Sequence, residues 1–221
     1  MEWIDLSLTI DDECMTCGTP WHIKPEINSL GRLETVGRNT SEIRLGSHSA
    51  THLDAPLHFL DGAYGVDEIP LEKLCGRIQV VDMTHKHAGS RVEKNELQGI
   101  VPSPKMLFHF GWYKHWQTKQ YYKDFPFFSL EALQYLLDGG LEMLALDTPS
   151  PDPGAAIGRL GDDSPGHKLL LKQKVVIVEY LANTDGLEAG AGYEIAALPL
   201  KLRGCDGSPA RVIIRRSEKN G

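Results

Sequence analysis

The chain has 221 residues, of which 41% are hydrophobic, and it carries a formal net charge of −7 at pH 7. This size and composition predict one globular domain that spans residues 1–221. The negative charge argues against a nucleic-acid partner, which needs a basic surface, and no apolar run approaches the roughly 18 residues of a membrane-spanning helix.

Strands predominate in the first half of the predicted fold. Residues 4–8 alternate between apolar and polar side chains, and residues 42–46 form a second strand that leads into a histidine-rich segment. Residues 76–82 and 106–110 have the length and apolar content of two further strands.

A dense aromatic cluster follows the fourth of these strands. It could line an aromatic substrate pocket or an interface, where Trp and Tyr are favoured, or it could pack against the core. Its members are Trp112, Tyr113, His115, Trp116, Tyr121 and Tyr122. The sequence leaves these alternatives open.

Helices alternate with strands in the second half. Ser129 is a favoured N-cap, the leucines after it form one apolar helical stripe, and Gly139 is suited to end that helix. Further strands are predicted at residues 141–146, 174–180 and 211–215, and a short helix at about 166–172. This order predicts a mixed α/β domain. We expect the long loop at 147–165 to lie beside the functional site.

The first five residues and the cysteines bear on where the protein acts. Residues 1–5 lack the basic and apolar regions of a signal peptide, so we expect a cytoplasmic protein with reduced cysteines. Cys14 and Cys17 form a lone CxxC motif without a second pair, and a metal or redox role for it is the less favoured interpretation.

The histidine-rich segment contains three of the nine histidines, His48, His52 and His58, together with Asp54. Neutral imidazole and carboxylate are ligands that borderline divalent metals prefer. In a straight strand the first two histidines would lie roughly 13 Å apart, whereas one turn would bring their Cβ atoms to about 5–6 Å. If both bind one ion, residues 48–52 must therefore form a turn.

The other two residues of this segment suit different tasks. Asp54 has two carboxylate oxygens and could bridge two ions. His58 is expected to act as a general acid and base rather than as a ligand, because imidazole titrates near neutral pH.

His167 and Glu179 are candidates for the rest of a metal site. Glu179 ends a β-branched run, residues 175–178, that is typical of a buried strand, where an unpaired acid is costly. The alternatives are an exposed or arginine-paired Glu179 and an ordinary helical His167. Asp147 and Asp152 could orient such ligands, but turn formation is the favoured interpretation for both.

Residues 48–58, HSATHLDAPLH, resemble the signature of the putative cyclase family, usually H-x-G-T-H-x-D-x-P-x-H. That family includes the bacterial kynurenine formamidases, or arylformamidases, and the isatin hydrolases. Later segments are similar to the family pattern in the same order: Phe110-Gly111-Trp112, the aspartate-rich residues 147–152, and His167 followed twelve residues later by Glu179. The resemblance spans nearly the whole chain.

The resemblance implies a swivelling β/β/α fold and two divalent ions per chain, usually zinc, with manganese in the isatin hydrolase branch. The ligands would be His48, His52 and Asp54 for one ion and Asp54, His167 and Glu179 for the other. His58 matches the catalytic histidine. The family also implies a homodimer or a higher homo-oligomer, in which Trp21 could contribute to a pocket across the interface.

Two segments depart from the family pattern. Ala50 stands where the family usually has glycine, and a positive φ there would strain alanine by about 1 kcal/mol. Residues 14–22 replace a Pro-rich, Gly-containing segment that helps to form the substrate pocket in relatives.

These observations predict a metal-dependent hydrolase that cleaves an amide or formamide bond in a small aromatic molecule, with arylformamide hydrolysis as the first choice. A cyclase or dehydratase could use the same metal site. A metal-dependent binding protein without turnover is a third interpretation, against which the spare His58 argues. Histidine and carboxylate ligands suit zinc, manganese and iron alike, so the residues do not choose among them.

Overall fold

The computed structural model describes residues 2–156 and 164–217. Within these ranges the main sheet has eight strands: β1 (Ile4–Asp5), β4 (His52–Asp54), β5 (Cys75–Asp82), β7 (Lys105–His109), β9 (Met143–Leu146), β10 (Val176–Glu179), β11 (Gly192–Pro199) and β12 (Gly207–Arg216). Their order is β1-β12-β11-β5-β7-β9-β10-β4. Because β4 also pairs with β12, the sheet closes on itself.

The closed sheet separates two hydrophobic cores. Strands β5, β7, β9 and β10 run parallel, and their side chains alternate between the two faces. In β7, Leu107 belongs to the core enclosed by the sheet, whereas Met106 and Phe108 belong to the core between the sheet and the helices. That outer core is covered by α3 (Lys94–Leu97), α4 (Leu130–Asp138) and α5 (Pro165–Lys172).

Most of the predicted elements are confirmed, with ends that differ by a few residues. Ser129 caps α4, because its hydroxyl accepts a hydrogen bond from the amide of Ala132. The first strand ends at Asp5 rather than at residue 8. Strand β3 (Thr40–Arg44) ends before the histidine-rich segment, where the prediction had extended to residue 46. Strand β11 was not predicted, although Tyr193, Ile195 and Ala197 alternate as buried residues along it.

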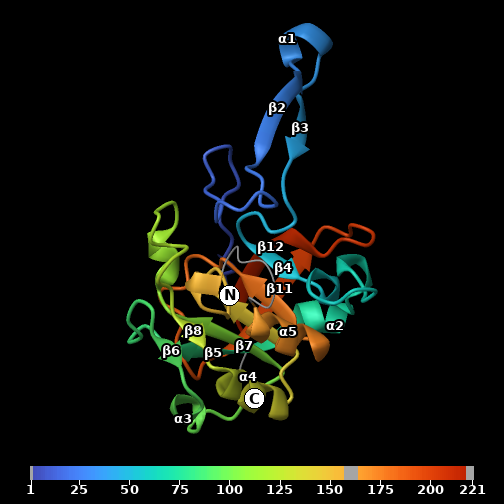
Figure 1. Cartoon of the computed structure of the whole chain (residues 1–221). Coiled ribbons are helices and arrows are strands. Elements are labelled where there is room, and N and C mark those ends of the chain that lie inside the picture. The colour runs from blue at the N-terminus through green and yellow to red at the C-terminus, as the bar shows by residue number, and fades with distance from the viewer. Residues whose placement is uncertain (1, 157–163, 218–221) are drawn as a thin grey trace.

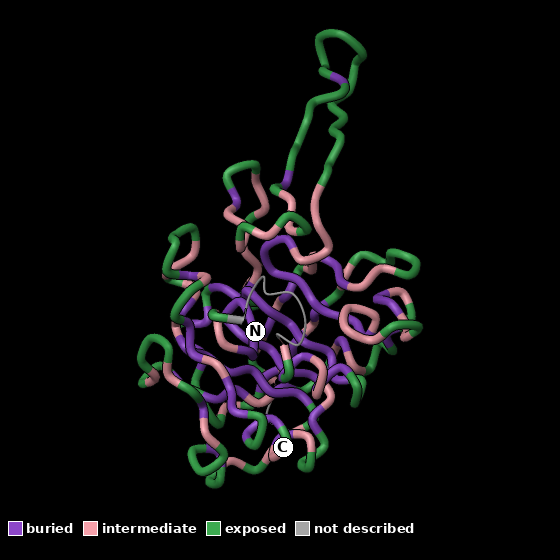
Figure 2. Tube along the Cα trace, viewed as in Figure 1, coloured by how far each residue is buried: buried purple, intermediate pink, exposed green. Residues whose placement is uncertain are grey.

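A long hairpin projects from the body of the molecule (Figure 1). It consists of β2 (Glu26–Gly31), α1 (Leu33–Val36) and β3, and we call these residues the arm. Nearly all of the arm is exposed (Figure 2). Its exposed large hydrophobic residues are Ile27, Leu30, Leu33, Val36 and Ile43.

The remaining elements are short. They are α2 (Leu71–Leu74), β6 (Arg91–Val92), β8 (Phe127–Phe128) and the 3-10 turns Pro56–His58, Val66–Glu68, Trp112–His115 and Gly154–Ala156. Residues 157–163 of the predicted loop 147–165 lie outside the described residues. None of the helices in the described part of the chain is long and apolar enough to cross a membrane.

Candidate metal centre

The turn expected at residues 48–52 is present. Residues 47–51 bend, β4 begins at His52, and the ring centroids of His48 and His52 lie 4.9 Å apart. Ala50 has a φ of +52°, the left-handed conformation that is strained for a residue with a side chain. Its carbonyl accepts a hydrogen bond from His52 Nδ1 at 2.7 Å, which helps to hold the turn.

Strand pairing determines which residues share the outer face of β4. Leu53 points into the enclosed core, so its neighbours His52 and Asp54 point outward. Strand β4 lies between β10 and β12, and Glu179 of β10 is paired directly with His52. The register therefore brings together residues that are more than 120 positions apart in the chain.

Helix α5 supplies His167, and Asp152 positions it. The carboxylate of Asp152 accepts hydrogen bonds from the amides of Gly166 and His167 at 2.7 and 2.9 Å. The same carboxylate lies 2.7 Å from His167 Nδ1. A carboxylate is favoured at the N-terminus of a helix, where free amides meet. The preference for a purely turn-forming Asp152 was therefore wrong, because this side chain orients a candidate ligand.

Asp147 has a structural role instead. Its carboxylate accepts hydrogen bonds from the amides of Phe110 and Gly111 and from the hydroxyl of Thr184. This buried network ties the end of β7 to the loop after β9.

The five predicted ligands converge on one buried centre. Asp54 Oδ1 lies 2.9 Å from His48 Nδ1 and 3.5 Å from His52 Nε2, and Asp54 Oδ2 lies 3.4 Å from His167 Nε2. The Glu179 oxygens lie 3.4 Å from His52 Nε2 and 3.2 Å from His167 Nε2. Three groups of donors in the described part of the chain each have their ligand atoms within 4.8 Å of one another: His48, His52 and Asp54; Asp54, His167 and Glu179; and His48, His58 and Asp206.

The carboxylate oxygens at this centre fit a cation. Both oxygens of Asp54 and Oε1 of Glu179 are buried and have no hydrogen-bond partner among the described residues. Leaving such atoms unpaired costs about 1–3 kcal/mol each, and more when the group is charged. A backbone carbonyl can only accept, so His52 Nδ1 carries the proton and its Nε2 lone pair faces the carboxylates. A divalent cation would satisfy both kinds of atom.

The charged groups at the centre shift one another's pKa values. Burial opposes a charged imidazole, but the Asp54 carboxylate and the hydrogen bond to Asp206 outweigh it and raise the pKa of His48 to about 10. Burial alone would raise the pKa of Asp54, yet the imidazoles of His48 and His167 hold it well below its usual range. The centre therefore stabilises carboxylate anions and positive charge beside each other.

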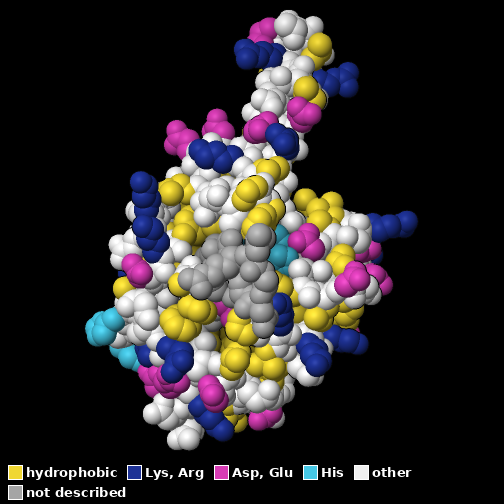
Figure 3. Space-filling model, in the orientation of Figure 1, with side chains coloured by type: hydrophobic (Ala, Val, Ile, Leu, Met, Phe, Trp, Pro, Cys, Tyr) yellow, Lys and Arg dark blue, Asp and Glu magenta, His cyan; other side chains and the backbone are white. Residues whose placement is uncertain are grey.

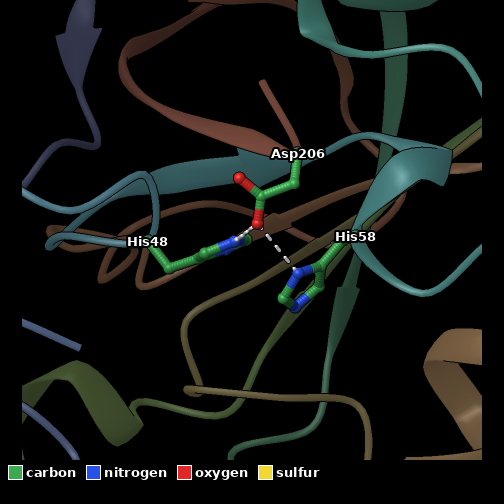
Figure 4. A group of neighbouring side chains, drawn as sticks. All are labelled: His48, His58 and Asp206. Carbon is green, nitrogen blue, oxygen red and sulfur yellow. Dashed lines mark hydrogen bonds and ion pairs between the residues drawn. The ribbon is translucent and has the colours of Figure 1, made fainter. Parts of the chain in front are cut away.

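His58 lies on the 3-10 turn after β4, at the edge of the centre. Its Nδ1 lies 3.1 Å from Asp206 Oδ2, and the same oxygen lies 2.7 Å from His48 Nε2 (Figure 4). Burial lowers the pKa of His58, despite the hydrogen bond to Asp206. Asp206 was not identified from the sequence, because Asp206-Gly207 has the composition of an ordinary turn.

A pocket opens over this centre. Its walls include the candidate ligands His48, His52, His167 and Glu179, as well as His58, Cys17, Trp21, His22, Phe59, Pro149, Ser150, Ser164 and Tyr180. Trp21 is 56% exposed and lines the pocket of its own chain. The N-terminal segment, which departs from the family pattern, therefore forms part of this pocket.

The aromatic cluster mainly packs against the core. Trp112 and Tyr121 are buried there, and the Trp112 indole donates a hydrogen bond to the Tyr121 carbonyl at 3.0 Å. Trp116 and Tyr122 are partly buried against the same core. Their rings pack around Tyr180, which is itself part of the pocket wall. The cluster thus contacts both the core and Tyr180, and through Tyr180 it supports the pocket wall.

Comparison with known proteins agrees with this architecture. Residues 4–153 match the family model described as putative cyclase. A kynurenine formamidase from Bordetella petrii is 31% identical over 179 residues, which are 80% of each chain. Isatin hydrolase A from Labrenzia aggregata, bound to benzyl benzoate, has a TM-score of 0.86 at 24% identity and covers 98% of this chain and 94% of its own.

A protein described as a potential metal-dependent hydrolase with cyclase activity is 27% identical, with a TM-score of 0.75 and coverage of 98% and 99% of the two chains. These structures confirm the fold predicted from the resemblance. The family model spans more than half of the chain, and the first relative exceeds 30% identity over most of it. The chain belongs to the putative cyclase family.

Proposed function

We propose that the protein is a hydrolase that uses two divalent ions to cleave an amide or formamide bond in a small aromatic molecule. One observation carries this proposal: three imidazoles each have one nitrogen anchored to an acceptor, and their other nitrogens converge on carboxylate oxygens that lack a partner. The similarity to kynurenine formamidases supports a reaction at a carbon–nitrogen bond other than a peptide bond.

The ligand assignment uses the two groups of neighbouring donors that share Asp54, whose two buried oxygens have no hydrogen-bond partner among the described residues. His48, His52 and Asp54 would hold one ion, and Asp54, His167 and Glu179 would hold the other. Nitrogen and carboxylate donors suit zinc, which we propose, and also manganese. When bound, two such ions lower the pKa of a water molecule and polarise a carbonyl group.

His58 belongs to neither of the two proposed ligand groups, since its nearest donor partners are His48 and Asp206, and it is the proposed general acid and base. Its Nδ1 lies against the Asp206 carboxylate, so the proton belongs on Nδ1 and the lone pair on Nε2. Nε2 can then take up a proton and deliver it to the nitrogen that leaves as the amide is cleaved. Loss of His58 would remove this transfer without removing a ligand.

The pocket walls support an aromatic substrate. Trp21, Phe59 and Tyr180 line the same pocket as the candidate ligands. Flat aromatic surfaces favour stacked or edge-on contacts with an aromatic ring. An arylformamide, which would release formate, and a cyclic aromatic amide both combine such a ring with a carbonyl group.

Cyclisation or dehydration at the same site is the second candidate. The relative described as having cyclase activity favours it. In hydrolysis, water adds to the carbonyl carbon and the negative charge develops on a tetrahedral oxyanion, whereas in the second candidate reaction the charge would develop on an enolate. Analysis of the products formed from each candidate substrate distinguishes the two reactions. The third interpretation, a binding protein without turnover, is less favoured, because such a protein would not need His58 outside the two proposed ligand groups.

The exposed arm supports the proposal of a homodimer. Ile27, Leu30, Leu33, Val36 and Ile43 are all exposed on the arm, and exposed apolar side chains that gather on one segment are typical of an association site. Figure 3 shows hydrophobic side chains on the arm interspersed with charged ones. Light scattering should give about twice the mass of one chain. A monomer at micromolar concentration would contradict this part of the proposal, and a cytoplasmic location stays a prediction.

Metal content and formate release test the proposed function. Protein purified without added metal should contain about two divalent ions per chain by elemental analysis. His48→Ala and Glu179→Ala should lose metal. His87→Ala is the control and should keep its metal, because His87 is exposed and is not a candidate ligand. The wild-type protein should release formate from aryl formamides.

Two results would contradict the proposal. One is a single ion or none in folded protein that has not been exposed to chelators. The other is a full complement of metal with no hydrolysis of any formamide or cyclic amide, which would leave the metal centre in place and exclude the reaction.

A further inference from the structure

One carboxylate oxygen joins two histidines of the centre. Asp206 Oδ2 lies 2.7 Å from His48 Nε2 and 3.1 Å from His58 Nδ1 (Figure 4). These two imidazoles are stacked at a tilt, with ring centroids 4.0 Å apart. Asp206 is therefore the one group in Figure 4 that contacts both a candidate ligand and the candidate acid and base.

The chemistry of a carboxylate determines what this contact does. An aspartate side chain is ordinarily an anion at neutral pH, and its oxygens can then only accept hydrogen bonds. In the neutral ring that would bind a metal ion, His48 must then donate from Nε2, which leaves the lone pair on Nδ1 facing Asp54. His58 must donate from Nδ1, which leaves Nε2 with its lone pair. A single anion thus selects opposite tautomers in the two rings.

The other candidate histidine ligands have equivalent anchors. His52 donates from Nδ1 to the Ala50 carbonyl, and His167 Nδ1 lies against Asp152. Anchors of this kind orient a ligating imidazole and fix its tautomer. Asp206 does the same for His48, but on the opposite nitrogen, and of these anchors it is the one that also contacts His58.

The backbone around Asp206 holds the carboxylate in this position. The Asp206 carbonyl accepts a hydrogen bond from the Ala55 amide at 2.9 Å, and Gly207 is paired with Asp54 across β12 and β4. Asp206 is thus attached by strand pairing to the segment that carries the candidate ligands. The position of its side chain does not depend on a flexible surface loop alone.

We propose that Asp206 is a positioning residue that fixes the orientation and tautomer of both His48 and His58, and so couples metal binding to proton transfer. The part that concerns His58 rests on the proposed hydrolase function. When Nε2 of His58 takes up a proton, the charge that forms on the ring lies beside the Asp206 anion, which stabilises it. Loss of Asp206 should therefore affect turnover more than substrate binding.

Three Asp206 variants test this inference. Asp206→Ala should lower kcat by about 10–100-fold and change KM by less than about threefold, and it should weaken zinc binding by a similar factor of about 10–100. Asp206→Asn keeps the size and one acceptor oxygen but loses the charge, so its loss should be smaller. Asp206→Glu keeps the charge but moves it, and it should not restore full turnover. Asp206→Asn also serves if Asp206→Ala does not fold.

The tautomer can be measured without substrate. In the zinc-loaded protein, long-range ¹H–¹⁵N spectra should show His58 protonated at Nδ1, with the resonances assigned by their loss in His58→Gln. In Asp206→Ala the proton should move to Nε2 or be shared between the two nitrogens. This measurement tests Asp206 even if the protein hydrolyses no amide, so failure of the proposed function and failure of this inference are distinguishable.

Asp67→Asn is a matched control. Asp67 accepts a hydrogen bond from the Gly204 amide at 2.8 Å, so it supports the turn that carries Asp206. This variant should keep wild-type kcat and zinc affinity. An equal loss in Asp67→Asn would mean that the turn, and not the carboxylate, matters. An unchanged His58 tautomer together with a kcat within about twofold of wild type in Asp206→Ala would overturn the inference.

Discussion

Gly207 allows the His48 ring to lie against strand β12. A Cβ atom added at Gly207 would lie 2.6 Å from His48 Cε1 and 3.0 Å from the Leu53 carbonyl oxygen. The Leu53 backbone cannot move aside easily, because Leu53 is paired with Ser208 in the closed sheet. In Gly207→Ala the imidazole must therefore retreat, although every candidate ligand is still present.

The size of the effect follows from these distances. Carbon atoms in contact lie about 3.5–4.0 Å apart, so the His48 ring must shift by about 1 Å. A shift of that size away from Asp206 would stretch the 2.7 Å contact beyond hydrogen-bonding distance. We expect overpacking to destabilise the protein by about 1–3 kcal/mol, or about 2–4 °C in Tm for each kcal/mol. Zinc affinity should fall by about 10–100-fold.

Thermal unfolding and zinc titration against a chromophoric chelator measure the two effects. Gly99→Ala is the control, since a Cβ atom at Gly99 has nothing within 4 Å, and its stability should change by less than about 0.5 kcal/mol. Wild-type zinc affinity in Gly207→Ala would refute the reasoning, because the ring position would then be irrelevant to metal binding.

Three further predictions concern the centre itself. Asp54→Ala should lose both ions, whereas His58→Ala should keep them and lose most turnover. Elemental analysis measures the metal content, and full occupancy in Asp54→Ala would contradict the role of Asp54 as a ligand shared by two ions. Asp152→Ala should weaken zinc binding by about 10–100-fold because His167 loses its anchor, and normal loading in a chelator titration would argue against that role. Chelation should lower the wild-type Tm in calorimetry, because Asp54 and Glu179 then lack a cation; an unchanged Tm would argue against structural coupling of the metal.

Local sequence was sufficient for features that depend on neighbouring residues. The spacing of His48 and His52 required a turn, and the structure contains one. Ser129 identified the start of α4 because an N-cap acts within a single helical turn. The resemblance also drew attention to residue 50, where relatives usually have glycine, and Ala50 has a positive φ in the structure.

Other features depended on long-range pairing. The interpretation of Asp152 was wrong, since nothing near it in the sequence indicates that it meets His167. Asp206 lies 148 residues from His58, and no spacing rule connects them. The exposed arm was not predicted either, because the residues of β2 and β3 do not specify whether their hairpin packs against the body or projects from it.

The sequence by itself therefore determined the kinds of candidate ligand, the turn that joins the first two, and most of the regular elements, because these follow from local chemistry and periodicity. Only the tertiary structure decided how the candidate ligands meet. Strand β4 pairs with β10 on one side and β12 on the other, which puts Glu179 and Asp206 beside the histidine-rich segment. Strand register is a collective property of the closed sheet, and a single strand does not encode it.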